Sequence, residues 1–127
     1  MDTRNRIAFI AHNNKKVEMT AFLYEFKEMI KQSCDLCVAT YTTGKELERM
    51  GFTVKSYESG PNGGDAQIAS RIVENKIKMV IFFIDPMDAH PHDADIKMLQ
   101  RVCLKKNIPM ALNKATAEIL IKAAKDL

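Results

Sequence analysis

The amino-acid sequence predicts an α/β fold, with a single three-layer domain over residues 1–127 in which helices cover both faces of a mostly parallel, five-stranded sheet. Two observations predict this fold. Short apolar segments alternate along the chain with longer segments that mix charged and apolar residues, which is typical of strands joined by crossover helices. The chain also has 127 residues, of which 46% are hydrophobic, and that is enough for one compact core.

Strands and helices alternate in the first half of the chain. Residues 6–11 (RIAFIA) are mostly apolar, as in a strand that is buried on both faces. Residues 15–33 are expected to form one long helix, because apolar residues recur near helical spacing between charges, at Val17, Leu23, Phe26 and Ile30. The next elements are a strand at 36–40, a short helix at 43–50 that a glycine ends, and a brief strand at 53–57.

The second half repeats this alternation. Turn-forming residues crowd together at 59–65 (SGPNGGD), and a helix follows to about Asn75. Residues 79–84 (MVIFFI) are the longest apolar run and predict the central strand. The remaining elements are a loop at 85–92, a helix from Asp93 with an apolar stripe, a last strand at 108–112 and a last helix at 115–125.

The predicted loops that follow the strands carry most of the reactive side chains. The carboxyl ends of parallel strands meet at one edge of the sheet, and ligands bind at that edge in open α/β folds. We therefore expect hydroxyls, glycines, carboxylates, imidazoles and lysines to converge there. The expected site residues are His12, Lys16, Thr40, Thr42, Thr43, Ser59, Gly60, Asp65, Asp85, His92 and Asp95.

The threonine-rich turn and the Ser59-Gly60 pair suggest a phosphate-binding site. Phosphate is held well by the backbone N–H groups at a helix N-terminus together with hydroxyl donors. Gly44 and Gly60 would allow the backbone to approach a ligand closely, and Lys16 would add a full positive charge. The alternative is that these residues are ordinary helix caps and turn formers.

Asp65, directly after Gly63-Gly64, is a candidate general base in a glycine-lined pocket. The alternative is an Asp in the first turn of a helix, which is common.

His92 is a candidate proton donor, which Asp95 would orient across one helical turn. His90 lies close in sequence, but no further ligand cluster accompanies it, so we predict no metal.

Cys34 and Cys37 form a C-x-x-C motif, and Cys103 lies on an apolar stripe. In thioredoxin-like proteins such a pair lies at a helix N-terminus, which lowers the thiol pKa. Here the pair follows a predicted helix C-terminus, which would raise the thiol pKa, so the sequence favours two small, half-buried structural residues. Cys103 is expected in the core.

Composition excludes several classes of protein. The net charge is only +3 and the basic residues are scattered, which argues against a nucleic-acid partner. No apolar run has the length of a membrane span, so no membrane partner is expected. An odd cysteine count and no evident signal peptide predict a cytoplasmic, reduced setting. A small anionic ligand would suit the mild basicity.

Six motifs occur in order along residues 6–121, each next to the strand or helix that should carry it, and together they resemble methylglyoxal synthases. The motifs are A-H-x-x-x-K at 11–16, A-T-x-T-T-G at 39–44, S-G-P-x-G-G-D at 59–65, F-F-x-D-P at 82–86, P-H-D-x-D-x-K at 91–97 and N-I-P-x-A-x-N-x-A-T-A at 107–117. The fold expected from this resemblance is methylglyoxal synthase-like.

The resemblance implies a lyase that converts dihydroxyacetone phosphate to methylglyoxal and inorganic phosphate through an enediolate, without a cofactor. It implies that Asp65 is the base and that His92, oriented by Asp95, polarises or protonates the substrate oxygen. The implied phosphate ligands are Lys16, Thr40, Thr42, Thr43, Ser59 and Gly60, while His12 and Asp85 line the pocket. It also implies a homohexamer.

Two positions depart from the family pattern. Asn13 stands where the family usually has Asp, and Tyr41 replaces the middle glycine of the threonine-rich turn, where it would narrow the pocket or require different backbone angles. The alternative function is a non-catalytic, phosphate-ligand-sensing domain of the same fold, as in the regulatory domain of carbamoyl-phosphate synthetase. The joint presence of Asp65, His92 and Asp95 favours catalysis.

Overall fold

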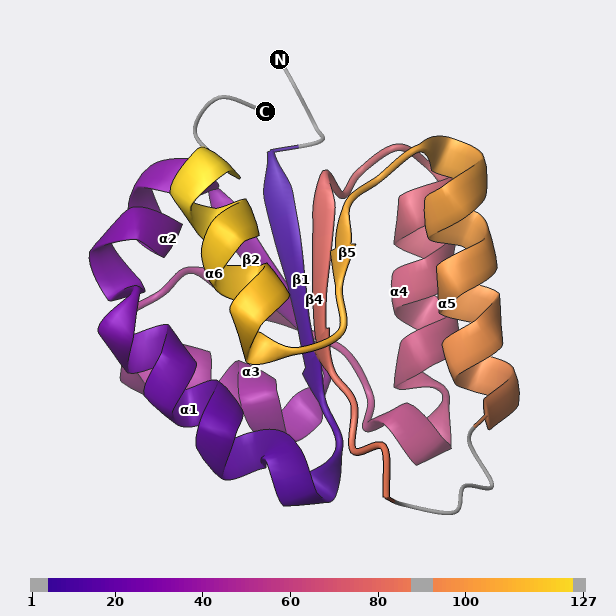
Figure 1. Ribbon diagram of the computed structural model, residues 1–127, viewed down its shortest axis with the longest axis horizontal. Helices are drawn as coiled ribbons and strands as arrows, with labels where there is room; N and C mark the ends of the chain where they lie inside the picture. The colour runs from indigo at the N-terminus through magenta and orange to yellow at the C-terminus, as the bar shows by residue number, and fades with distance from the viewer. Residues whose placement is uncertain (1–4, 88–92, 125–127) are drawn as a thin grey trace.

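Five parallel strands form the middle layer, in the spatial order β3-β2-β1-β4-β5 (Figure 1). The computed structural model of the chain describes residues 5–87 and 93–124. The middle strand is β1, and the run that the sequence predicts as the central strand forms β4 beside it, with every residue buried. The strands are β1 (Arg6–Ala11), β2 (Leu36–Ala39), β3 (Val54–Ser56), β4 (Met79–Phe83) and β5 (Met110–Ala111).

Helices cover both faces of this sheet and complete the predicted three-layer α/β fold (Figure 1). The helices α1, α2, α3 and α6 pack on one face, and α4 and α5 pack on the other. Each face has its own cluster of buried side chains, because alternate residues of β1 point to opposite faces. The helices are α1 (Lys16–Glu25), α2 (Lys27–Ser33), α3 (Tyr41–Arg49), α4 (Gly64–Val73), α5 (Asp93–Lys106) and α6 (Lys114–Ala123).

The predicted long helix over residues 15–33 is wrong in one respect, because the structure divides it at Phe26. This residue has φ −106° and ψ 20°, outside the helical range, and it separates α1 from α2. Its side chain is buried, and its ring lies 5.2 Å from that of Phe22. No Gly or Pro marks the break, so packing of an aromatic ring against the core accounts for it better than backbone preference.

Smaller differences concern where elements begin and end. The helix α3 begins at Tyr41 rather than at residue 43, and β5 contains two residues rather than five. Within the described residues, no helix has the length and apolar character needed to cross a membrane. All five strands run from the upper to the lower part of Figure 1, so their carboxyl ends lie together at the lower edge.

Candidate active site

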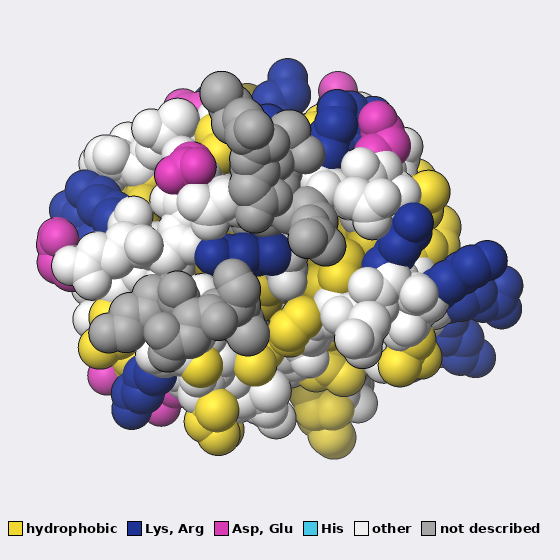
Figure 2. Space-filling view, turned by 90° about the horizontal axis from the view of Figure 1, so that it is seen from above, with side chains coloured by type: hydrophobic (Ala, Val, Ile, Leu, Met, Phe, Trp, Pro, Cys, Tyr) yellow, Lys and Arg dark blue, Asp and Glu magenta, His cyan; other side chains and the backbone are white. Residues whose placement is uncertain are grey.

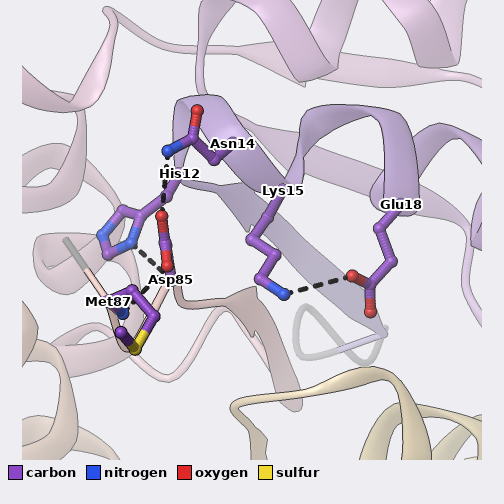
Figure 3. A network of polar contacts seen from close by, with 6 residues as sticks. All are labelled: His12, Asn14, Lys15, Glu18, Asp85 and Met87. Carbon is purple, nitrogen blue, oxygen red and sulfur yellow. Dashed lines mark hydrogen bonds and ion pairs between the residues drawn. The ribbon is translucent and has the colours of Figure 1, made fainter.

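His12, Asn14 and Asp85 form a polar cluster at the carboxyl edge (Figure 3). His12 follows β1 and Asp85 follows β4, and these two strands are paired side by side. The cluster also includes a 3₁₀ turn, η1 (Asn13–Lys15), which carries Asn14. The Asn14 Nδ2 group donates to Asp85 Oδ2 at 3.0 Å, and the backbone N–H of Met87 donates to Asp85 Oδ1 at 2.9 Å. Asp85 is thus brought beside His12, as the sequence predicts.

The Asp85 carboxylate is held in its charged form. Its pKa is lowered from the ordinary value, first because Asn14 donates a hydrogen bond and then because the Met87 N–H does so. The positive charge of Lys15 acts in the same direction. The Lys15 Nζ also lies 3.3 Å from Glu18 Oε2, with which it forms an ion pair (Figure 3). The loop after β4 therefore presents a fixed negative charge at the strand ends.

The imidazole of His12 is oriented by the backbone. The N–H of Asp85 donates to His12 Nδ1 at 2.9 Å, so Nδ1 is an acceptor and the proton of the neutral ring resides on Nε2. Its ring also packs edge-on against Phe82, at 5.2 Å between ring centroids. This tautomer makes Nε2 a hydrogen-bond donor, which suits the stabilisation of an oxygen that gains negative charge.

Asp65 lies in the first turn of α4 and is 5% exposed. The 3₁₀ turn η2 (Gly60–Asn62) precedes it, and Gly63 links the turn to the helix with φ 101°, a left-handed angle that favours glycine. A Cβ placed on Gly60 would lie 3.3 Å from Asp65 Oδ1. Gly60 and the Asp65 carboxylate are therefore adjacent, and the missing side chain leaves room beside the carboxylate.

Gly64 has a packing role in the same turn. A Cβ on Gly64 would overlap the backbone carbonyl of Glu58, so only glycine fits there. The glycine-rich segment thus folds tightly enough to bring Asp65 against the Ser59-Gly60 turn. The glycines of this segment are therefore required by the shape of the turn that carries Asp65.

The threonines at the end of β2 are arranged on the first turn of α3. Thr40 and Thr43 are buried, at 7% and 4% exposure, whereas Thr42 is exposed. Thr40 occupies the N-cap position of α3, yet its side chain does not cap the helix. By contrast, Asn113 caps α6 by accepting a hydrogen bond from the N–H of Thr116 at 2.9 Å. The Thr40 hydroxyl is therefore not committed to its own helix.

Gly44 does not act as the sequence predicts. A Cβ on Gly44 would overlap Ser56 Oγ, so this glycine permits α3 to pack against β3 rather than a ligand to approach the backbone. Tyr41 lies in the same helix, and the expectation that it narrows the pocket stays a prediction. Its side chain is 52% exposed beneath the Lys45 ammonium, and it starts α3 with helical backbone angles.

The remaining predicted residues lie at the same edge or outside the described residues. Ser59 precedes η2, Lys16 begins α1 and Asp95 lies in the first turn of α5. His92 and His90 lie outside the described residues, so the pairing of His92 with Asp95 stays a prediction. In the part of the chain that the structure describes, no three His, Cys, Asp or Glu side chains gather as a metal site.

Sequence reasoning missed the contribution of Asn14. Its partner Asp85 lies 71 residues away along the chain, so no local pattern links the two. Only the pairing of β1 with β4 brings them together. A signal was nevertheless present, because Asn14 immediately follows the His12-Asn13 pair that the motif includes.

Comparison with known proteins identifies the family. The family model of the MGS-like domain matches residues 18–112. Methylglyoxal synthase of Clostridium botulinum (strain Eklund 17B / Type B) is 47% identical over 118 residues, which are 92% of this chain and 98% of that protein. The chain belongs to the methylglyoxal synthase family.

Further methylglyoxal synthases agree with this assignment. That of Bacillus cytotoxicus is 44% identical over 119 residues, which cover 93% of this chain and 89% of that protein. The crystal structure of methylglyoxal synthase from Elizabethkingia anophelis NUHP1 matches with a TM-score of 0.82 and 41% identity, covering 95% of this chain and 79% of that one. The predicted family and fold are therefore confirmed.

Proposed function

We propose that this protein is a methylglyoxal synthase, a carbon–oxygen lyase that converts dihydroxyacetone phosphate to methylglyoxal and inorganic phosphate. The observation that carries the proposal is the 44–47% identity to proteins of that name over more than nine-tenths of the chain. The same identity favours catalysis over a ligand-sensing domain of this fold. Cytoplasmic location and assembly into a homohexamer belong to the proposal as properties of such an enzyme.

Asp65 is the proposed base, which removes a proton from the hydroxymethyl carbon of the substrate. Its burial and the absence of a side chain at Gly60 support this role, because a carbon acid must approach the carboxylate closely. Removal of the proton places negative charge on the former carbonyl oxygen and forms an enediolate. That charge requires hydrogen-bond donors fixed in advance.

His12 and His92 are the proposed donors to the substrate oxygens. The support for His12 is its tautomer, which the Asp85 backbone N–H sets by placing the proton of the neutral ring on Nε2. His92 is assigned by the family motif, with Asp95 as the residue that orients it. Asp85 acts beside His12 as a fixed negative charge in the pocket.

The proposed phosphate ligands are the first turn of α3, the Ser59-Gly60 turn and Lys16. Support comes from the Thr40 hydroxyl, which does not cap α3, so the N–H groups and the hydroxyl at this helix end can face an anion. Thr42 and Thr43 lie in the same turn. Lys16, at the start of α1, supplies the full positive charge.

The phosphate ligands also determine whether the enediolate eliminates phosphate. The bond between the terminal carbon and its phosphate oxygen breaks when it stands out of the enediolate plane, because the electron pair can then flow into that bond. Phosphate leaves, and the enol that remains becomes methylglyoxal. Holding the phosphate at several points fixes this angle, so binding and reaction course are coupled.

The decisive experiment incubates the purified protein with dihydroxyacetone phosphate and measures dicarbonyl and inorganic phosphate together. Equal molar release above the rate without protein is expected. Glyceraldehyde 3-phosphate is measured in parallel, because an isomerase acting on the same enediolate would form it instead. Formation of glyceraldehyde 3-phosphate without release of inorganic phosphate would contradict the proposal, and so would the absence of turnover.

A further inference from the structure

Two cysteines outside the candidate active site lie against each other at the opposite edge of the sheet. Cys34 follows the last residue of α2, and Cys37 lies in β2. The chain bends at Asp35 between them, and the two Sγ atoms are 3.9 Å apart. The Cys37 N–H donates to the Thr53 carbonyl at 2.9 Å, which holds this part of β2 in place.

The Cys34 thiol differs from what its place after a helix C-terminus suggests. Its pKa is lowered, first through the hydrogen bond that its sulfur shares with Cys37, and further because the Lys78 ammonium is near; burial and the Asp35 carboxylate act against this shift. The pKa of Cys37 is raised, first by its hydrogen bond to Cys34 and then by burial. The predicted raised pKa is therefore correct for Cys37 and wrong for Cys34.

A surface pocket gives access to this pair. It has a volume of about 200 Å³, and its walls include both cysteines, Lys31 and Phe52. The Lys31 Nζ lies over the Phe52 ring, 5.4 Å from its centroid, and Asp35 also lines the pocket, so the pocket presents one charge of each sign. Cys34 is half-buried, whereas Cys103, on the other face of the sheet, is 2% exposed and its pKa is raised to about 11 by burial.

We propose that Cys34 and Cys37 form a dithiol site that exchanges with small disulfides such as oxidised glutathione and closes reversibly to an intramolecular disulfide. The Cys34 thiolate attacks one sulfur of the small disulfide, forms a mixed disulfide and releases one thiolate. Cys37 then attacks Cys34 Sγ, loses its proton to solvent and releases the second thiolate. Two cysteine thiols are oxidised and one small disulfide is reduced to two thiols.

The geometry suits both steps. A disulfide requires about 2.05 Å between sulfurs, so the two Sγ atoms need to approach by about 2 Å. Cys34 is half-buried whereas Cys37 is 2% exposed, so Cys34 is the sulfur that a small disulfide reaches first. Once Cys34 has become a mixed disulfide, its negative charge and its acceptor role are gone, and Cys37 ionises more readily.

The test uses oxidised glutathione with the full chain, followed by alkylation of the remaining thiols and mass spectrometry. Cleavage after lysine places both cysteines on one peptide, residues 32–45, and Cys103 on another. We expect the peptide 32–45 to carry no alkyl groups and to be lighter than its reduced form by the mass of two hydrogen atoms, whereas Cys103 is still alkylated. Dithiothreitol should reverse the change. Cys34 should react with the alkylating agent at least about tenfold faster than Cys103.

Two variants assign the order of attack, and a third is the matched control. Cys37→Ser should accumulate a stable glutathione adduct on Cys34, Cys34→Ser should form almost none on Cys37, and Cys103→Ser should behave as the unchanged protein. Three results with the unchanged protein would overturn the proposal. Both cysteines would stay reduced in oxidised glutathione, the reaction would stop at a mixed disulfide, or Cys103 would be oxidised equally fast. An adduct that forms on Cys37 as readily as on Cys34 would overturn the assigned order.

Discussion

The two edges of the sheet differ in the groups that face the helix ends, which are C-termini at the amino edge and N-termini at the carboxyl edge. At the amino edge, Lys78 Nζ donates to the carbonyl of Ser33, where α2 ends, and to that of Ala124, just after α6, at 3.5 Å. It also donates to Asn5 Oδ1 at 2.9 Å. Figure 2 looks onto this edge and shows a basic side chain near the middle of the face. The partial negative charge of two helix C-termini is thus neutralised by the protein's own ammonium group.

At the carboxyl edge the helix N-termini differ: Asn113 caps α6 and Asp65 lies in the first turn of α4, whereas α3 begins without a side-chain cap. The uncapped start of α3 supports the proposed anion site at the carboxyl edge, whereas the Lys78 contacts at the amino edge serve stability. Substitutions at the two edges should therefore separate stability from activity.

The largest expected effect is at the carboxyl edge. Asp65→Asn removes the proposed base and leaves the phosphate ligands in place, so kcat should fall about 10³-fold. Calorimetric titration with inorganic phosphate should still show binding close to that of the unchanged protein. A variant that keeps most of its rate would refute the assignment of the base.

Next in size is a change at the amino edge. Lys78→Met leaves the carbonyls of Ser33 and Ala124 without their cation, so the free energy of unfolding should fall by about 2 kcal/mol. Urea denaturation measures the loss. The kcat of the folded variant should change less than twofold, and a strong loss of kcat with unchanged stability would break the comparison.

A smaller loss of activity is expected for Gly60→Ala. The new methyl group would lie 3.3 Å from Asp65 Oδ1 and displace the carboxylate slightly, so kcat should fall about tenfold. Gly51→Ala is the matched control, because Gly51 lies at the end of α3, away from the site, although its left-handed φ makes that substitution costly to stability. Equal rates for Gly60→Ala and the unchanged protein would argue against contact between the substrate and this carboxylate.

The smallest effect concerns pH. The pKa of Asp85 is lower in the folded protein than in the unfolded chain, where it is about 3.9. On acidification the unfolded chain takes up the proton first, so this stabilisation is complete above about pH 5 and is lost as the pH falls through the folded pKa. Asn14→Ala brings the folded pKa of Asp85 closer to the ordinary value.

The difference in unfolding free energy between Asn14→Ala and the unchanged protein should therefore be largest near neutral pH and should shrink toward about pH 3. Urea denaturation at several pH values measures it. Asn13→Ala, an exposed neighbour in the same turn, is the control and should show no such trend. A difference independent of pH would mean that Asn14 does not act through the Asp85 charge.

Elements that depend on local pattern could be predicted from the sequence, and those that depend on distant contacts could not. The run of five buried apolar residues in β4 and the glycine-rich turn before Asp65 are local signals, and a buried strand and a turn occur where they are predicted, although β1 rather than β4 is the middle strand. The break at Phe26 arises from ring packing in the core. The Asn14–Asp85 hydrogen bond and the lowered pKa of Cys34 arise from side chains that only the folded chain brings together.

The hydrogen bond that orients His12 comes from a peptide group, and this has a consequence for mutagenesis. Every residue except proline would supply the same N–H at position 85. A set of replacements there would remove the carboxylate while the ring keeps its protonation pattern, and only proline would take away both. Saturating this single position with all amino acids would thus distinguish the role of the acid from that of the main chain in one experiment.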